Sequence, residues 1–299
     1  MIDEKYADGV IVKGIGGFYY ISHDGQITEC HARGKFRKAD ISPIVGDKVT
    51  IQINEDNTGS IVKIHERKNF LIRPGVANLD TIVIVSAAKS PMPDFFLIDK
   101  LLVSAESKGI EAVLCLNKTD LVGENDVRHF CDVYEKAGYK VIAASAKTGE
   151  GADEIQGIIK GKTVAFAGLS GVGKSSLIKH ITGLDLQTGG VSKIERGKHT
   201  TRHVELFPFG DGFVFDTPGF SRLETDELYA TDLWQYFPEI RRLEGQCRFR
   251  TCSHRSEIGC VVSQAAQNGT IAQSRYESYK TLFNTLNEIK DWQRKDVNI

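Results

Sequence analysis

The sequence predicts an α/β domain with a doubly wound parallel sheet, placed between a small all-β barrel of the OB type and a mostly helical C-terminal segment. Five short runs rich in β-forming residues, separated by turn residues, predict the barrel. From residue 79 onward, long apolar runs alternate with amphipathic helical patterns, which is typical of a doubly wound sheet. Near the C-terminus, three of the six cysteines lie close together. We therefore expect three domains, at residues 1–71, 72–228 and 229–299.

Composition and charge narrow the class of protein. The 299 residues suffice for two or three domains, and the formal net charge of −1 means that any polyanion site must be a local patch. No apolar run approaches the ~20 residues that span a membrane, and the N-terminus lacks the apolar core of a signal peptide. We expect a cytoplasmic monomer without membrane contact. In that reducing compartment the cysteines do not form a disulfide framework.

The runs that predict the barrel occupy residues 10–12, 18–21, 27–30, 48–53 and 60–64. Turns that contain glycine, asparagine or aspartate separate them, which is the turn chemistry of hairpins. Five short strands of this kind suit an OB barrel. Such barrels commonly bind oligonucleotides through one face and its loops.

A predicted loop of the barrel carries four cations around one aromatic residue. They are Arg33, Lys35, Arg37 and Lys38, around Phe36. This composition is typical of RNA contacts, because cations grip phosphates and a ring can stack on a base. A solvated loop without a ligand is the alternative, and composition alone does not separate the two. The barrel context favours RNA binding.

The central segment predicts strands that are buried on both faces, because they are almost entirely apolar. They occupy residues 81–85, 112–116, 141–144 and 163–167, and helical patterns separate them at 95–107, 127–136 and 153–159. In such a sheet, ligands bind at the carboxyl ends of the strands. Motifs with known chemistry stand at those ends.

The strand at 163–167 leads into a loop that fits the phosphate-binding pattern G-x-x-x-x-G-K-[ST], and a helical pattern follows at 176–181. Its glycines let the backbone wrap around phosphates and aim N–H groups at them. Lys174 is expected to reach the β- and γ-phosphates, and the Ser175 hydroxyl to ligate Mg²⁺. The expected nucleotide contacts here are Gly168, Leu169, Ser170, Gly171, Val172, Gly173, Lys174, Ser175 and Ser176.

Two motifs at neighbouring strand ends fit the recognition of guanine. They are Asn117-Lys118-Thr119-Asp120 and Ser145-Ala146-Lys147, and all seven residues are expected at the nucleotide. The Asp120 carboxylate can accept from the guanine N1–H and N2 amino group, a pair of donors that adenine does not offer. Asn117 and Lys118 are expected to brace the loop and cover the base. The Ala146 N–H is expected to reach the guanine O6 atom.

Further along the chain lie the elements of a nucleotide-dependent switch. A predicted hairpin leads into Asp216-Thr217-Pro218-Gly219. Asp216 is expected in the Mg²⁺ shell, and the Gly219 N–H is expected to sense a γ-phosphate. A hydroxyl group from Thr200 or Thr201 would complete the metal site only when a triphosphate is present.

The combined motifs resemble those of translation-factor-type GTPases, but their order along the chain is shifted. Here N-K-x-D and S-A-K precede the phosphate-binding loop, and D-x-x-G comes last. With a barrel in front and a cysteine cluster behind, nearly the whole chain resembles the circularly permuted ribosome small-subunit-dependent GTPase A (RsgA) family. The resemblance implies hydrolysis of GTP to GDP and phosphate with Mg²⁺, stimulated by the small (30S) ribosomal subunit. It also implies a role in late maturation of that subunit through contacts with its rRNA.

Phe220 follows Gly219 at the position where many GTPases carry a glutamine that orients the attacking water. Because phenylalanine can neither donate to nor accept from water, we expect slow intrinsic hydrolysis. His199 is the candidate for positioning the water, and the resemblance points to the same histidine. A solvated loop histidine is the alternative. The expected catalytic residues are His199, Lys174, Thr200 and Thr201.

The C-terminal segment carries a potential metal site within fourteen residues, formed by Cys247, Cys252, His254 and Cys260. Three thiolates and one imidazole are the ligand set of a closed, tetrahedral and therefore structural Zn²⁺ site. Small buried cysteines that cluster by chance are the alternative. The other cysteines, Cys30, Cys115 and Cys131, are interpreted as packing residues. Past residue 269, apolar residues at helical spacing predict a long amphipathic helix that packs on its own domain.

Two other functions fit the same motifs. A metabolic P-loop nucleotide enzyme, such as a small-molecule kinase, would be indifferent to ribosomes and would need an acceptor pocket, for which no motif is evident. A GTP-stabilised RNA-binding protein that acts independently of ribosomes would keep its affinity for RNA when Lys174 is replaced by alanine.

Overall fold

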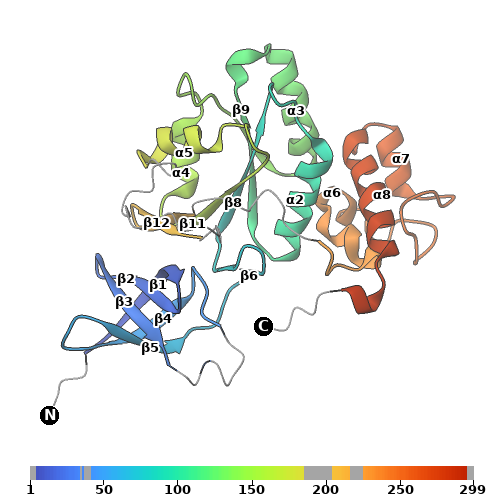
Figure 1. Cartoon of the computed structure of the whole chain (residues 1–299). Coiled ribbons are helices and arrows are strands. Elements are labelled where there is room, and N and C mark those ends of the chain that lie inside the picture. Colours follow the sequence, from blue (N-terminus) through green and yellow to red (C-terminus); the bar gives the residue numbers. More distant parts are fainter. Residues whose placement is uncertain (1–4, 34–35, 37–41, 185–203, 216–224, 295–299) are drawn as a thin grey trace.

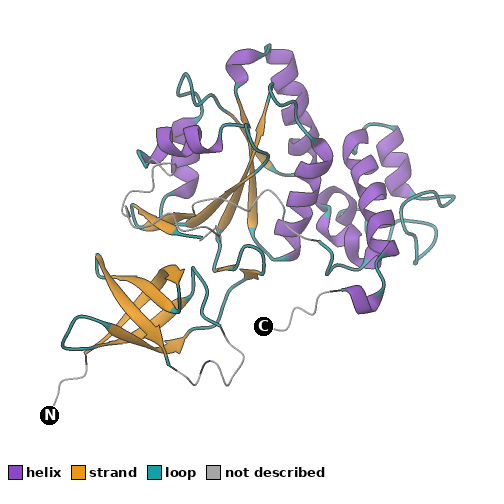
Figure 2. Cartoon of the chain, in the orientation of Figure 1, coloured by secondary structure: helices purple, strands orange, loops and turns teal. Residues whose placement is uncertain are grey.

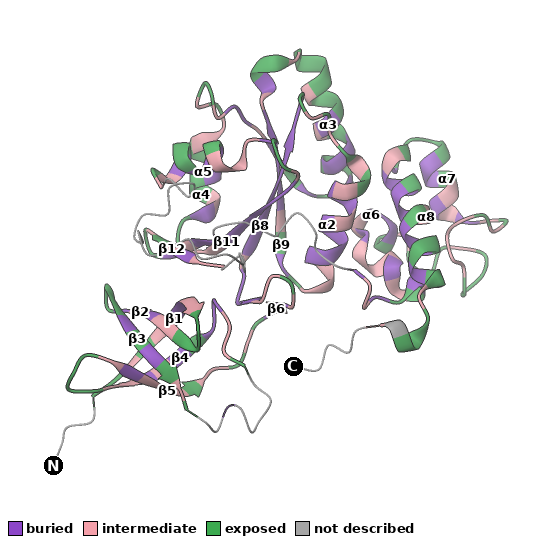
Figure 3. Cartoon of the chain, viewed as in Figure 1, coloured by how far each residue is buried: buried purple, intermediate pink, exposed green. Residues whose placement is uncertain are grey.

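The computed structural model describes residues 5–33, 36, 42–184, 204–215 and 225–294. A β-barrel, a central α/β part and a C-terminal helical part follow one another along the chain (Figures 1 and 2). Buried residues form the inside of the barrel, cover both faces of the central sheet and fill the space between the C-terminal helices (Figure 3). The predicted fold class is confirmed. Among the described residues, no helix combines the length and the apolar character needed to cross a membrane.

The barrel closes in the strand order β1-β2-β3-β5-β4. Its strands are β1 Lys5–Ile15, β2 Phe18–His23, β3 Gln26–Ala32, β4 Lys48–Ile53 and β5 Gly59–Ile64. Alternate residues point inward, so that Ile21 and Ile51 are fully buried in its core. Strand β1 is longer than predicted, because residues 5–10 pair with β4 and residues 10–15 pair with β2, with a bulge between Ile11 and Lys13 in the pairing with β2.

The central sheet has six strands in the order β10-β9-β8-β11-β13-β12. Neighbouring strands are parallel, except that β12 is antiparallel to β13. The strands are β8 Thr81–Ala87, β9 Glu111–Asn117, β10 Lys140–Ala143, β11 Thr163–Ala167, β12 Leu206–Phe209 and β13 Gly212–Phe215. Every residue of β8 is buried, as predicted for a strand covered on both faces.

Helices cover both faces of this sheet, because successive strand residues point to opposite sides. Ile82 and Ile84 pack with α2 and α3, whereas Val83 and Val85 pack with α4 and α5. The helices are α2 Phe95–Ser107, α3 Glu124–Ala137, α4 Ala152–Ile159 and α5 Lys174–Thr182, with a 3-10 turn η1 Thr119–Leu121. Helix α2 has the predicted bounds, since the Asp94 side chain caps its first turn.

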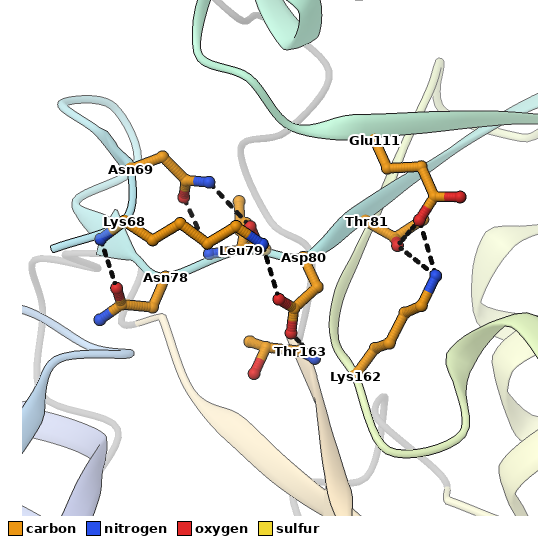
Figure 4. A network of polar contacts seen from close by, with 9 residues as sticks. All are labelled: Lys68, Asn69, Asn78, Leu79, Asp80, Thr81, Glu111, Lys162 and Thr163. Atoms are coloured by element: carbon orange, nitrogen blue, oxygen red, sulfur yellow. Dashed lines mark hydrogen bonds and ion pairs between the residues drawn. The ribbon is translucent and has the colours of Figure 1, made fainter.

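A polar network fastens the segment between barrel and sheet to the amino ends of the central strands (Figure 4). A short hairpin, β6 Phe70–Leu71 and β7 Val76–Ala77, forms this segment. The Asn69 side chain donates to Leu79 O at 2.8 Å and accepts from Leu79 N–H at 2.9 Å. The Asp80 carboxylate accepts from Lys68 Nζ at 2.9 Å and from Thr163 N–H at 2.8 Å. The connecting segment is therefore tied to two central strands.

The C-terminal part is helical, as predicted. Its elements are η2 Ala230–Tyr236, α6 Pro238–Arg241, α7 Val261–Gln267, α8 Gln273–Glu288 and η3 Asp291–Gln293. Helix α8 buries Tyr279, Leu282 and Leu286 in the core of its own part. It also lies against α2 of the α/β part, a contact that the sequence pattern did not predict.

Arg275 of α8 forms a buried ionic cluster at this contact. Its guanidinium donates to the Asp99 carboxylate of α2 at 2.7 Å and to the two Glu239 carboxylate oxygens at 2.7 and 3.1 Å. The Arg275 side chain is only 1% exposed. Burial alone would lower the pKa of Arg275, but the carboxylates of Asp99 and Glu239 raise it well above its usual value. The cation therefore stays charged and joins the two parts.

Replacing Arg275 by alanine is expected to lower the free energy of unfolding by about 3 to 5 kcal/mol, because Asp99 and Glu239 would stay buried without a cation. Both tryptophans of the chain, Trp234 and Trp292, lie in the C-terminal part. Urea unfolding followed by tryptophan fluorescence therefore measures the change.

The matched control is Lys280→Ala, which removes an ion pair with Glu277 on the more exposed side of the same helix. This pair is expected to contribute less than about 1 kcal/mol. If Arg275→Ala and Lys280→Ala lowered the free energy of unfolding equally, the buried ionic cluster of Arg275 would not stabilise the contact between the two parts.

Candidate nucleotide and metal sites

The loop between β11 and α5 is the phosphate-binding loop predicted from the sequence. Gly168 has φ +134°, and a β-carbon there would lie 2.1 Å from the Val85 carbonyl oxygen of β8. Gly173 has φ +95°, and a β-carbon there would lie 2.3 Å from Asn117 Nδ2 at the end of β9. Both positions require glycine, because a side chain would collide and the backbone is left-handed. The loop therefore lies directly against the carboxyl ends of β8 and β9.

The Lys174 ammonium group lies against the curve of this loop. Its Nζ atom donates to Gly168 O at 2.9 Å and to Leu169 O at 2.7 Å. Burial lowers the pKa of Lys174, and an anion held by the loop would favour the charged form again. Ser175 follows in the first turn of α5, where the helix dipole also favours an anion. The arrangement suits the binding of phosphate groups.

Asn117 joins the phosphate-binding loop to both guanine motifs. This side chain is buried at the end of β9, and its Nδ2 atom donates to Val172 O at 2.8 Å. Its Oδ1 atom accepts from the Ala146 N–H at 3.0 Å. One amide group thus fixes the phosphate-binding loop and the S-A-K loop relative to each other.

Lys118 reaches across the same loop. Its backbone is left-handed, with φ 64°, and its Nζ atom donates to Gly171 O at 2.7 Å and to Ser90 O. Sequence reasoning missed Ser90, which follows β8 and has no motif of its own. The sequence offered one indication that Ser90 lies near the site, namely its position just after the carboxyl end of a central strand.

Asp120 is held by the S-A-K loop. Its Oδ1 atom accepts from the Ser145 hydroxyl at 2.7 Å, and its Oδ2 atom lies 3.9 Å from Lys147 Nζ. The neighbouring Thr119 hydroxyl lies 3.0 Å from both Ala144 O and Glu150 Oε2. Glu150 is a second residue that sequence reasoning missed. These contacts set the orientation of the Asp120 carboxylate before any base is bound.

A cavity of about 350 Å³ opens between the two sets of motifs. Its lining consists of Asn117, Lys118, Asp120, Leu121, Ser145, Ala146, Lys147, Gly173 and Ser176. This volume lies within the roughly 300 to 1,000 Å³ of small-molecule sites. A larger cavity of about 610 Å³ is lined by Asp120 and by α3, but by none of the described residues of the phosphate-binding loop. The smaller cavity is therefore the candidate site for a nucleotide base.

The switch residues predicted from the sequence lie outside the described residues. They are His199, Thr200, Thr201, Asp216, Gly219 and Phe220. Strand β13, which lies beside β11 and ends at Phe215, directly precedes Asp216, and the described chain resumes at residue 204, three residues after Thr201. Three of the four predicted RNA-binding cations, Lys35, Arg37 and Lys38, also lie outside the described residues.

The predicted RNA-binding loop differs from expectation at its aromatic residue. Arg33 is exposed, and its guanidinium donates to Gln52 Oε1. Phe36, in contrast, is buried in the barrel core beside Ile61. The Phe36 ring packs with the barrel core and is therefore not free to stack on a base, although the sequence had suggested such stacking.

The four predicted metal ligands meet in space. The ligand atoms of Cys247, Cys252, His254 and Cys260 all lie within 4.8 Å of one another. His254 Nδ1 lies 3.5 Å from Cys247 Sγ and 3.8 Å from Cys260 Sγ. Tetrahedral bonds of about 2.0 to 2.3 Å to one Zn²⁺ ion imply ligand separations of about 3.5 to 3.8 Å. The cluster therefore fits a single metal ion.

Burial favours the neutral forms of these ligands when no cation is bound. It raises the thiol pKa values of Cys252 and Cys260 and lowers the pKa of His254. A neutral imidazole is ready to bind a metal, and a metal ion reverses the cost of forming buried thiolates.

Glu257 shapes the loop that carries the ligands, and sequence reasoning missed it. Its carboxylate accepts from the backbone N–H groups of Ser253, Arg255 and Ser256, at 2.6, 3.0 and 3.1 Å. Burial raises the pKa of Glu257, but hydrogen bonds from the Ser253 hydroxyl and from backbone N–H groups outweigh burial and lower this pKa to about 2. The Tyr279 hydroxyl donates to Ser253 O at 3.0 Å. The loop is therefore held by its own carboxylate and by α8.

Comparison with known protein families places most of the chain in two models. A model described as RsgA GTPase matches residues 64–226, and one described as RsgA N-terminal domain matches residues 8–61. A curated relative from Agathobacter rectalis, named small ribosomal subunit biogenesis GTPase RsgA, is 43% identical over 294 residues, covering 93% of this chain and 97% of the relative. A relative of the same name from Caldanaerobacter subterraneus subsp. tengcongensis is 46% identical over 291 residues, covering 96% and 97%.

Two solved structures share the fold over nearly the whole chain. YjeQ from Thermotoga maritima superposes with a TM-score of 0.83 at 36% identity, covering 96% of this chain and all of YjeQ. YloQ, described as a circularly permuted GTPase, superposes with a TM-score of 0.81 at 34% identity, covering 96% of each chain.

Proposed function

Because the chain belongs to the RsgA family of circularly permuted GTPases and hydrolyses GTP, we propose that the small ribosomal subunit stimulates this hydrolysis during late maturation of that subunit. The relatives are named for biogenesis of the small subunit. We propose the same process for this chain, through contacts of its barrel and C-terminal part with rRNA.

We propose that one GTP molecule spans the 350 Å³ cavity and the phosphate-binding loop. The observation that carries this proposal is the double contact of Asn117, with Val172 O on one side and Ala146 N–H on the other. The guanine would place its N1–H and N2 amino groups at Asp120 and its O6 atom at the Ala146 N–H. The triphosphate would extend along residues 168–175 toward Lys174, and Lys118 would cover the base.

We propose that Ser175, Asp216 and either Thr200 or Thr201 hold Mg²⁺ beside the phosphates. Bound Mg²⁺ neutralises the charge that develops on the phosphoryl oxygens. Lys174 and the backbone N–H groups of the loop would stabilise the same charge. His199 would orient the attacking water, because Phe220 offers no donor or acceptor for it. Such a site works by positioning and electrostatics rather than by a covalent intermediate.

We propose that the Cys₃His cluster holds one structural Zn²⁺ ion. The ligand set of three thiols and one imidazole, and the 3.5 and 3.8 Å separations of His254 Nδ1 from Cys247 Sγ and Cys260 Sγ, support this choice of metal. All four positions are filled by protein atoms, so that the ion would stabilise the fold without taking part in hydrolysis.

We propose further that the chain acts as a cytoplasmic monomer whose functional units are residues 1–71, 72–228 and 229–299. Arg33, Lys35, Arg37 and Lys38 are proposed as rRNA contacts of the first unit. The exposure of Arg33 supports its part in such a contact.

GTP turnover is expected to rise when purified small subunits are added, by anything up to the ~10³- to 10⁵-fold seen when a partner completes a GTPase site. Stimulation at subsaturating subunit concentration should fall steeply as salt rises, because phosphate contacts release counterions. Steady-state phosphate release across a salt series measures both effects. Turnover that is unchanged by subunits at every salt concentration would contradict the proposal.

A further inference from the structure

Glu150 closes the S-A-K loop against the end of strand β10. The Ser145 N–H group donates to Glu150 O at 3.0 Å, so that the two ends of the loop are joined. The next residue, Gly151, has φ +73°, and a β-carbon there would lie 2.4 Å from Ala143 O of β10. This close packing leaves the backbone little freedom to move at Glu150.

The Glu150 side chain reaches from this loop to the N-K-x-D motif. The Thr119 hydroxyl lies 3.0 Å from Glu150 Oε2 and 3.0 Å from Ala144 O. A hydroxyl group has one proton to donate, and Ala144 O already accepts from the Thr119 N–H at 3.2 Å. The carboxylate is the stronger acceptor, because it is charged. Thr119 is only 8% exposed, and Glu150 therefore holds the residue that directly precedes Asp120.

Glu150 lies behind Asp120 as seen from the cavity proposed for the base. Asp120 lines this cavity of about 350 Å³, whereas Thr119 and Glu150, both of which the structure describes, do not. All three residues line the larger cavity of about 610 Å³. Any effect of Glu150 on a base in the smaller cavity must therefore pass through Thr119 and Asp120.

Asp120 is thus held at two places. Ser145 Oγ, which accepts from the Thr148 N–H at 3.2 Å, donates to Asp120 Oδ1 at 2.7 Å. The peptide bond to Thr119 holds the backbone of Asp120, and Glu150 anchors Thr119. Removing the Glu150 side chain would release the second of these contacts alone, because Glu150 contacts Ser145 through its backbone oxygen.

We propose that Glu150 is a positioning residue for the recognition of guanine, an inference that rests on the proposed function. The Asp120 carboxylate must face the guanine N1–H and N2 amino groups together, and hydrogen bonds weaken steeply as their angles depart from linearity. A small turn of Asp120 would keep one of the two bonds and weaken the other. Hypoxanthine has the N1–H group but lacks the N2 amino group, so that the preference for GDP over inosine diphosphate measures this alignment.

The test compares the affinities of full-length variants for GDP and for inosine diphosphate, measured by displacing a bound fluorescent nucleotide. In Glu150→Ala we expect the affinity for GDP to fall roughly three- to tenfold, on the scale of one hydrogen bond, and that for inosine diphosphate to fall less than about twofold. Glu150→Gln keeps a hydrogen-bonding group within reach of Thr119 and should retain the wild-type preference to within about twofold.

The matched control is Glu154→Ala. Glu154 is another exposed glutamate, on the neighbouring helix α4, where its carboxylate lies 3.0 Å from Lys140 Nζ. Its replacement should leave both affinities unchanged.

A double-mutant cycle tests whether the effect passes through Thr119. Thr119→Val removes the hydroxyl group while keeping the shape of the side chain. We expect Glu150→Ala to change the preference no further when Thr119→Val is already present, because the two residues act through one contact. A preference that falls by the same factor in both backgrounds would overturn the proposal.

Two results for Glu150→Ala would also overturn it. They are an unchanged preference, and an equal loss of affinity for both nucleotides, which would indicate a general loss of folded protein. When the wild-type chain prefers GDP, either result leaves the proposed base site intact. A wild-type chain that binds both nucleotides equally would refute the placement of the guanine N2 amino group at Asp120, and this inference with it.

Discussion

Replacing Asp120 by asparagine is expected to lower the affinity for GTP by roughly 10² to 10⁴, because two charge-assisted hydrogen bonds to the guanine edge are lost. The same variant should gain affinity for xanthosine triphosphate, since the asparagine amide can donate to the xanthine C2 oxygen. Ser145 Oγ, 2.7 Å from Asp120 Oδ1, can still accept or donate, so that the side chain keeps its position. The affinities of the wild-type and variant proteins for GTP and for xanthosine triphosphate can be measured by displacing a bound fluorescent nucleotide with each of them.

The matched control for this prediction is Asp126→Asn. Asp126 is an exposed carboxylate in the first turn of α3, and its replacement should leave both affinities unchanged. An Asp120→Asn variant that still prefers guanine would remove Asp120 from the base site.

Removing the proposed Zn²⁺ ion from the Cys₃His cluster is expected to unfold the C-terminal part. Structural zinc contributes roughly 10 to 16 kcal/mol of apparent binding free energy in small zinc domains, as much as the whole stability of a typical domain, about 5 to 15 kcal/mol. Without the ion, nothing would hold Cys247 and Cys260 together in this loop. The hydrogen bond from the Tyr279 hydroxyl of α8 to Ser253 O would then be lost as well. Metal analysis, with tryptophan fluorescence before and after chelation, follows both events.

The corresponding substitution is Cys252→Ser, with Cys131→Ser as its control. Cys131 is a half-buried cysteine of α3 outside the cluster. We expect one equivalent of zinc in the control protein and a large loss in Cys252→Ser. Full zinc content in Cys252→Ser, or unchanged fluorescence after complete chelation, would contradict a structural site.

Local patterns predicted most of the sheet and the described half of the nucleotide site. Helix α2 has its predicted bounds because Asp94 supplies a cap directly before an apolar face. The phosphate-binding loop was predictable because Gly168 and Gly173 meet a steric requirement that no other residue meets. Asp120 and the S-A-K loop followed from their positions after apolar strands, since the ends of parallel strands share one edge of the sheet.

Contacts between distant parts of the chain were not predictable from such patterns. Phe36 lies among cations in the sequence, but it is buried in the barrel core. Arg275 looks like a surface residue of an amphipathic helix, yet Asp99 and Glu239 from other helices surround it. Glu150 belongs to no motif, and its carboxylate contacts the hydroxyl of Thr119, the residue before Asp120. In each case the deciding partner is remote in sequence, so that local composition carries no information about it.

The most direct test of the shared nucleotide site is the structure of the chain with a non-hydrolysable GTP analogue and Mg²⁺. We predict that Asp120 lies within about 3 Å of the guanine N1 and N2 atoms, and that Lys174 Nζ lies within about 3 Å of the β- and γ-phosphate oxygens of the same molecule. A nucleotide whose phosphates lie in the loop while its base lies outside the cavity lined by Asp120 would contradict this prediction.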